Sequence, residues 1–219
     1  MNPLQLKQLE FGSFLSYDPH GSTHNAIQSR KLIPHLKQDL PLGQSPILMS
    51  EWIVKKICES MINLKFCSFF KSNPILVPVP KSSLMHDGTL WVPKRIADAL
   101  EKQGFGTVAT YLKRVKPLAK SAISNSGARP DAQQHYDSLT VQEKLVKPDR
   151  DILLIDDVIT RGAAFLGSAN RLANTFPNCS IRGFAVMRTM GYIKPFIKIE
   201  DPCMGHIFLD DNGTLTRYP

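Results

Sequence analysis

The stretch RDILLIDDVITRGAAF, residues 150–165, carries the strongest structural signal in the chain. Its run of four apolar residues predicts a buried strand, and two aspartates, Asp156 and Asp157, follow at once. A short turn then leads into an apolar pattern that predicts an amphipathic helix over 165–176, and the sequence IRGFAVMRT, 181–189, predicts the next strand. Strand, helix and strand in this order predict an α/β fold, a parallel twisted sheet flanked by helices.

The two aspartates fall where a parallel sheet of this kind binds ligands, beyond the carboxyl end of a strand. We expect the residues after them to form a short loop into a helix N-terminus, where small side chains and unpaired amides suit a phosphate. Carboxylates would repel that phosphate, so they make sense if they face sugar hydroxyls or a hydrated divalent cation. The stretch therefore suits a ligand with both a phosphate and a polyol. A plain strand-to-helix turn with surface aspartates, or a simple sugar-nucleotide loop, is the alternative. The expected loop residues are Val158, Ile159, Thr160, Arg161, Gly162, Ala163 and Ala164.

Bulk properties predict an ordinary globular protein. The chain has 219 residues, of which 42% are hydrophobic, enough for one domain with a small appendage. It has no apolar run of membrane-spanning length and no secretion signal, so we expect no membrane partner. Its four cysteines form no Cys-x-x-Cys pair, which argues against a zinc site or a disulfide framework. These features predict a cytoplasmic protein with reduced thiols.

The formal net charge of +8 leaves two interpretations open, a solvated basic surface or attraction to a polyanion. Residues 111–150 hold eight Lys or Arg against four acids, a surplus of four. A phosphate-rich small ligand and a nucleic acid would both suit this segment.

The N-terminal part, residues 1–70, is loosely patterned. Pro34 allows only a short or late-starting helix between residues 22 and 40. A clearer helix follows over 50–64, with Ser50 as its expected N-cap.

The middle of the chain has firmer signals. PILVPVPKSS, 74–83, predicts a buried strand that stops near its prolines, and WVPKRIADALEKQG, 91–104, predicts a helix. GTVATYLKRV, 106–115, predicts a second strand. Residues 116–138 are polar with little periodicity, and a long stretch of this kind is usually functional or disordered. Near the C-terminus, a hairpin is expected around Asn212 and Gly213.

The segment ILLIDDVITRGAA, 152–164, resembles the phosphoribosyl-pyrophosphate motif of type I phosphoribosyltransferases. It departs from that motif at Arg161, where Thr or Ser is usual, and at Ala164, where Thr is common. The resemblance implies the type I phosphoribosyltransferase fold, with a core over 71–190 and a small hood. Either terminal segment, 1–70 or 191–219, could supply this hood, and the second could instead be a hairpin.

The remaining matches are weaker and follow the family's order. VPVPKSS resembles the loop that binds pyrophosphate, which implies contacts from Lys81, Ser82 and Ser83; an ordinary proline-rich strand end is the alternative. The polar segment 116–138 lies where the family has a loop that closes over the active site. Arg129, as a catalytic cation, and His135 are the candidates to reach pyrophosphate from it. Together the motifs look most like the ComF-like branch, although the cysteine zinc ribbon that often begins such proteins is missing.

The resemblance implies a phosphoribosyltransferase that uses phosphoribosyl pyrophosphate and Mg²⁺. Asp156 and Asp157 would hold the ribose hydroxyls and metal-bound water, and a nucleobase-like acceptor would attack the sugar. The acceptor itself is unknown, although Tyr192 and Phe196 could stack on a base. Members of this fold also act as sensors of the same ligand that regulate nucleic acid or a partner protein. A homodimer, or a subunit of a defence or competence system, stays open as well.

Overall fold

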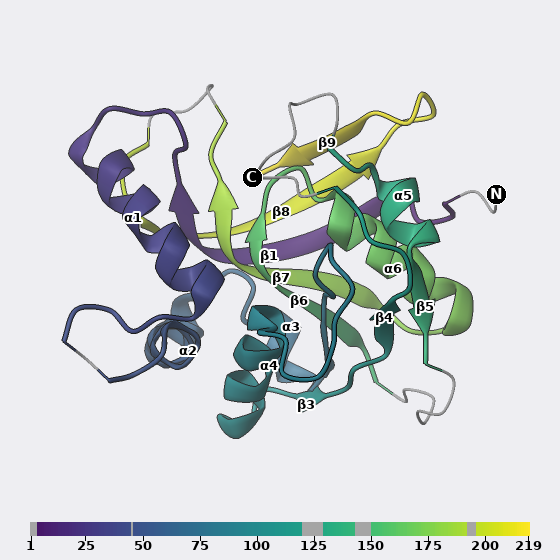
Figure 1. The fold of residues 1–219 in the computed structure, drawn as a ribbon, viewed down its shortest axis with the longest axis horizontal. Helices are drawn as coiled ribbons and strands as arrows, with labels where there is room; N and C mark the ends of the chain where they lie inside the picture. Colours follow the sequence, from purple (N-terminus) through teal and green to yellow (C-terminus); the bar gives the residue numbers. More distant parts are fainter. Residues whose placement is uncertain (1–3, 45, 120–128, 143–149, 192–195) are drawn as a thin grey trace.

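The computed structural model describes residues 4–44, 46–119, 129–142, 150–191 and 196–219. Their main feature is a twisted seven-stranded sheet in the order β3-β2-β6-β7-β1-β8-β9 (Figure 1). The first five strands of this order are parallel, while β8 is antiparallel to β1 and β9 is antiparallel to β8. The α/β class and the mostly parallel sheet are therefore as predicted. The strands are β1 (Gln8–Tyr17), β2 (Ile75–Pro78), β3 (Thr107–Val108), β6 (Ile152–Ile159), β7 (Ile181–Thr189), β8 (Glu200–Leu209) and β9 (Leu215–Tyr218).

Helices cover both faces of the sheet. One face packs against α1, α2, α3 and α4, and the other against α5 and α6. Strand β6 shows why its sequence is continuously apolar: Leu153 and Ile155 enter the core on the first face, and Ile152 and Leu154 enter the core on the second. The helices are α1 (His24–Gln38), α2 (Met49–Ser60), the 3-10 turn η1 (Met61–Asn63), α3 (Ser68–Lys71), α4 (Val92–Lys102), α5 (Ala132–Asp137) and α6 (Ala163–Thr175).

Strand β1 was not predicted from the sequence, yet it lies inside the sheet between β7 and β8. Its residues are buried on both faces, which hides the alternation that marks a half-exposed strand. At the other end of the chain, β8 and β9 form the expected hairpin, closed by a turn in which the Gly213 amide donates to the Asp210 carbonyl at 3.1 Å. The terminal segments thus contribute three strands to the main sheet.

Three local predictions were wrong. Helix α1 runs through Pro34 for 15 residues, because packing of residues such as Leu36 outweighs the proline's cost of about 3 kcal/mol. Helix α2 begins at Met49, so Ser50 lies in its first turn instead of capping it. The expected strand 106–115 is divided into β3 and a separate strand β4 (Leu112–Arg114), which pairs with β5 (Leu139–Val141) in a small antiparallel sheet.

None of the helices in the described ranges is long and apolar enough to cross a membrane.

Candidate functional site at the ends of two adjacent strands

Strands β2 and β6 are neighbours, and their chain connections depart in opposite directions. The ladder pairs Pro78 with Ile155, which brings the carboxyl ends of both strands to the same edge. From β2 the chain passes through α4 to β3 on one side, and from β6 it passes through α6 to β7 on the other (Figure 1). Because α4 and α6 cover opposite faces, the two loops diverge, and such a switch point is where open α/β sheets bind ligands.

The loop after β6 is shorter than predicted. Val158 and Ile159 belong to β6, because they pair with Met187 and Arg188 of β7. Helix α6 already begins at Ala163, so the loop consists of residues 160–162.

Gly162 shapes the start of α6. It is the N-cap residue with a φ of 93°, a left-handed conformation that favours glycine. A Cβ at this position would also lie 2.6 Å from Cδ1 of Ile207 on β8. Thr160 and Arg161 beside it are exposed, and Ala163 and Ala164 form the first turn of the helix. The amides of that turn have no partner inside the helix, so the loop can bind an anion.

The acidic pair lies just before this loop. The backbone amide of Asp157 donates to Oδ1 of Asp156 at 2.8 Å, and the Val158 amide donates to Oδ1 of Asp157 at 2.6 Å. Burial and the charge of Asp157 raise the pKa of Asp156 well above its ordinary value. The pair therefore holds one carboxyl whose charged form an approaching cation would favour.

Lys37 is a site residue that sequence reasoning missed. Its Nζ lies 2.7 Å from Oδ1 of Asp157, although 120 residues separate them. Burial lowers the pKa of Lys37, but Asp157 and Asp156 outweigh this effect and raise it overall. No sequence signal could have found this contact, because it depends on how α1 packs across the end of the sheet.

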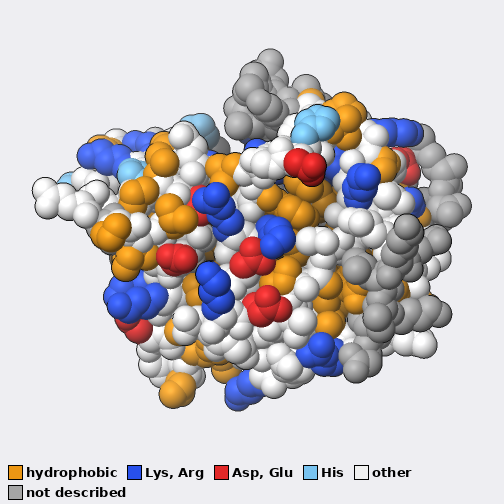
Figure 2. Space-filling view, turned by 60° about the horizontal axis from the view of Figure 1, so that its bottom comes forward, with side chains coloured by type: hydrophobic (Ala, Val, Ile, Leu, Met, Phe, Trp, Pro, Cys, Tyr) orange, Lys and Arg blue, Asp and Glu red, His pale blue; other side chains and the backbone are white. Residues whose placement is uncertain are grey.

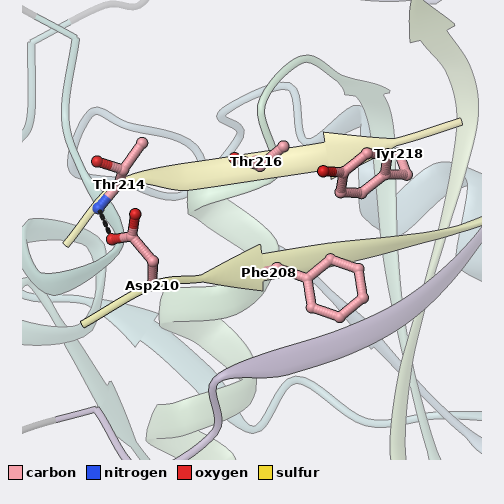
Figure 3. A pocket seen from close by; sticks show the side chains of 5 residues that line it. All are labelled: Phe208, Asp210, Thr214, Thr216 and Tyr218. Carbon is pink, nitrogen blue, oxygen red and sulfur yellow. Dashed lines mark hydrogen bonds between the residues drawn. The ribbon is translucent and has the colours of Figure 1, made fainter. Parts of the chain in front are cut away.

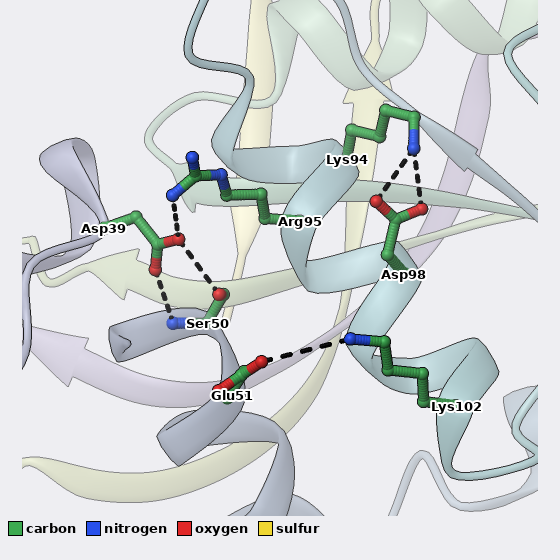
Figure 4. Close-up of polar contacts among 7 residues, drawn as sticks. All are labelled: Asp39, Ser50, Glu51, Lys94, Arg95, Asp98 and Lys102. Carbon is green, nitrogen blue, oxygen red and sulfur yellow. Dashed lines mark hydrogen bonds and ion pairs between the residues drawn. The ribbon is translucent and has the colours of Figure 1, made fainter. Parts of the chain in front are cut away.

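Asp39 fixes the end of α1 that carries Lys37. Its buried carboxylate accepts from the Ser50 amide at 2.7 Å, from the Ser50 hydroxyl at 3.1 Å and from Nη1 of Arg95 at 2.8 Å (Figure 4). One side chain thus ties α1 to α2 and to α4.

A buried arginine holds the backbone of the loop after β2. Arg114 of β4 donates to the carbonyl of Lys81 at 2.7 Å and to that of Pro80 at 3.2 Å. Burial lowers its pKa to about 10, while the charge of Asp156 acts in the opposite direction. The Leu118 amide also donates to the Ser82 carbonyl at 2.8 Å. This leaves the exposed Lys81 side chain and the half-buried Ser82 and Ser83 at the switch point. Arg114 was missed because it stood in a segment predicted as plain strand.

The expected closing loop is partly helical. Residues 132–137 form α5, which starts with a capping box between Asp131 and Gln134. His135 is buried in this helix against Gly167 of α6, and its pKa is lowered to about 3 by burial and by Arg114. The sequence placed His135 on a loop, and this placement was wrong.

Three other candidates are Arg129, Phe196 and Tyr192. Arg129 is half-buried, and its Nε has no hydrogen-bond partner. Phe196 is half-buried shortly before β8, and Tyr192 lies outside the described residues.

The acidic pair alone does not make a complete metal site. The described ranges contain no group of three or more His, Cys, Asp or Glu side chains that could hold a metal ion. Two adjacent carboxylates do fit Mg²⁺, which usually keeps several waters and takes its other ligands from a bound phosphate compound. Asp156 and Asp157 would hold it, through water.

Two hollows on the surface lie elsewhere. One, of about 380 Å³, lies on the β8–β9 hairpin, where the Thr214 amide donates to Asp210 at 2.7 Å (Figure 3). It is lined by Phe208, Asp210, Thr214, Thr216 and Tyr218. The other is lined mainly by residues of α5, β5 and α6. Neither includes a predicted site residue.

Charges of both signs are mixed on the face that carries α2 and α4. Figure 2 shows Lys and Arg side chains interspersed with Asp and Glu there. Ion pairs such as Lys94 with Asp98 at 2.8 Å and Lys56 with Glu59 at 2.8 Å explain the pattern. The residues of this face that the structure describes form no single-sign patch of the kind that tracks a nucleic-acid backbone.

No model of a known protein family matches the chain, and a search of curated proteins found no match.

Proposed function

We propose that the protein is a type I phosphoribosyltransferase of the ComF-like branch. It would transfer ribose 5-phosphate from phosphoribosyl pyrophosphate to a nucleobase-like acceptor and release pyrophosphate. One observation carries the proposal: the acidic pair, the Gly162 loop and the Lys81 loop meet at the switch point of a mostly parallel sheet. The proposed type I phosphoribosyltransferase fold, with its hood, rests on the resemblance of residues 152–164 to the motif of that family.

Different residues would bind different parts of the ligand. Thr160, Arg161 and the first amides of α6 would bind the 5-phosphate. Lys81, Ser82 and Ser83 would bind the pyrophosphate, with Arg114 keeping their backbone in place. In this arrangement the 5-phosphate and the pyrophosphate would bind at separate points along one edge of the sheet.

Asp156 and Asp157 would accept hydrogen bonds from the ribose 2- and 3-hydroxyls. As pyrophosphate departs, positive charge builds on the sugar, and fixed carboxylates nearby stabilise it in the transition state. When bound, Mg²⁺ neutralises the charge of the leaving pyrophosphate. Lys37 holds the Asp157 carboxylate in place before the sugar arrives. Arg129 stays the candidate for a further cation at the pyrophosphate.

The proposed location is the cytoplasm. All four cysteines are free thiols, which suits a reducing compartment.

Calorimetric titration with phosphoribosyl pyrophosphate and Mg²⁺ tests the proposal, followed by a screen of bases for pyrophosphate release. The wild-type protein should bind the ligand, and the double variant Asp156→Asn with Asp157→Asn should lose turnover by at least about a hundredfold. Asp98→Asn, which removes a half-buried acid of α4, is the matched control and should behave as wild type.

Two results would change the conclusion. Normal binding and turnover in the double variant would show that the site is elsewhere. Binding without pyrophosphate release across the whole panel would favour a sensor, and salt-dependent binding of DNA or RNA would then point to regulation of nucleic acid.

A further inference from the structure

Two arginines lie near each other next to the Gly162 loop, and only one of them is paired with an acid. Arg188 of β7 is 3% exposed. It donates to the Ser13 hydroxyl at 3.3 Å and to the carboxylate and carbonyl of Asp201. Arg217 of β9 donates to the Thr189 carbonyl and lies over the ring of Phe11 at 5.7 Å. The chain thus places two cations and one anion at the carboxyl end of β7.

Arg217 has no counter-ion of its own. Within the described ranges, no carboxylate forms an ion pair with it, and burial together with Arg188 lowers its pKa to about 10. An unpaired buried guanidinium is costly unless an anion neutralises it. After Arg188 and Asp201 are paired, the cluster keeps one unit of positive charge.

Several hydrogen-bond donors of this cluster are also unused. Nε of Arg188 and both Nε and Nη1 of Arg217 are buried and lack a partner. Each such group loses its hydration without compensation, at a cost of about 1–3 kcal/mol. Unused donors of this kind in a native structure require an explanation, and an acceptor from outside the chain would supply one.

The cluster adjoins the candidate site. In the sheet, Arg188 pairs with Ile159, the last residue of β6 before the loop at 160–162. Arg217 pairs with Ile207, and Ile207 is the residue against which Gly162 packs. A ligand held at the ends of β2 and β6 would therefore lie beside the part of the sheet that carries these arginines.

We propose that Arg188 and Arg217 form a subsite for a carboxylate, and that the acceptor substrate is a heterocycle with a carboxyl group. This inference rests on the proposed function and names the substrate class of the same site. A net charge of one unit matches a monoanion, and the guanidinium fork matches the planar geometry of a carboxylate. Arg217 acts as a specificity-determining residue, while Asp201 holds Arg188 in position.

Matched pairs of acceptors test the inference. Orotate is compared with uracil, and nicotinate with nicotinamide, because the members of each pair differ mainly in a carboxylate. With phosphoribosyl pyrophosphate and Mg²⁺, the wild-type protein should release pyrophosphate at least about tenfold faster with the acid of at least one pair. Arg217→Met should lose this preference, and Arg217→Lys should keep part of it. Arg182→Met, on the same strand as Arg188 but at its opposite end, should leave it unchanged.

Calorimetry separates failure of this inference from failure of the proposed function. Binding of phosphoribosyl pyrophosphate without any preference for acids overturns the carboxylate subsite and leaves the transferase intact. If the sugar phosphate does not bind, the proposed function fails, and titration with orotate and uracil alone decides the subsite. Tighter binding of orotate that Arg217→Met weakens supports it, and equal or absent binding overturns it. If Arg217→Met does not fold, as judged by thermal melting, the comparison of wild type with Arg217→Lys still decides between these outcomes.

Discussion

Asp156 is surrounded by groups that disfavour its charged form. Burial and Asp157 raise its pKa, and Lys37 offsets only part of that effect. Because an aspartate in an unfolded chain has a pKa of about 3.9, the folded state binds the proton more tightly. The resulting stability is present below about pH 4 and is lost as the pH rises toward the raised pKa of the folded protein.

We therefore expect Asp156→Asn to stabilise the ligand-free protein at pH 7.5, since a neutral amide avoids the cost of ionising a buried carboxyl next to Asp157. Urea unfolding at pH 7.5 and at pH 4 measures the effect, and the gain should shrink at the lower pH. Asp98→Asn should change little, because Asp98 is only half-buried and forms a solvent-accessible ion pair with Lys94. A variant less stable than wild type at pH 7.5 would show that the charged form of Asp156 is not disfavoured by its surroundings.

His135 has the opposite dependence on pH. Its pKa is lowered to about 3 in the folded protein, mainly by burial, against about 6.5 in an unfolded chain. The unfolded state therefore takes up a proton first, and stability is lost as the pH falls below about 6.5.

Replacing His135 by Gln should remove this loss. Between pH 7 and pH 5 the free energy of unfolding should fall by about 2 kcal/mol less in the variant than in wild type. Denaturant titrations at the two pH values give the comparison, with His86→Gln on an exposed loop as the control. Equal pH sensitivity in variant and wild type would mean that His135 is accessible to protons in the folded state.

At the scale of elements, Asp39 joins three helices by one carboxylate (Figure 4). It also has a φ of 50°, a left-handed conformation that aspartate and asparagine tolerate better than alanine. The end of α1, and with it the position of Lys37, depends on this residue.

We expect Asp39→Ala to lower the free energy of unfolding by about 3–5 kcal/mol, since it leaves buried donors unsatisfied and adds backbone strain. Asp39→Asn should cost less, because it keeps one acceptor and the backbone preference. Glu51→Ala removes only a 4.0 Å exposed contact with Lys102 and should change stability by less than about 0.5 kcal/mol. Urea unfolding of the three variants gives the ranking. An Asp39→Ala protein as stable as Glu51→Ala would show that Asp39 does not hold the three helices together.

At the scale of the whole molecule, the elements with a clear period were predictable, and those that depend on distant packing were not. The apolar run of β6 and the period of α4 led to the correct strand and helix, and the apolar pattern over 165–176 led to α6. Strand β1 was not predicted because both of its faces are buried. The length of α1 was not predicted because packing overrides Pro34.

The residues of the candidate site likewise include some that a local sequence pattern marks and others that depend on distant packing. The acids and the two loops are contiguous in sequence, and the parallel pairing of β2 with β6 brings them to one edge. Lys37, Arg114, Arg188 and Arg217 come from four other segments. Only the tertiary structure sets their distances, so no local pattern could have marked them.

The position of β1 bears on the predicted division at residues 70 and 190. Because β1 lies between β7 and β8, a fragment of residues 71–190 would lose the partner of β7 and expose its edge. We expect the full chain to unfold in one transition, with fluorescence of Trp52 and Trp91 coinciding with far-ultraviolet circular dichroism. The fragment should show no cooperative transition in urea. A fragment that unfolds cooperatively, or two separate transitions in the full chain, would instead establish residues 71–190 as an independent core.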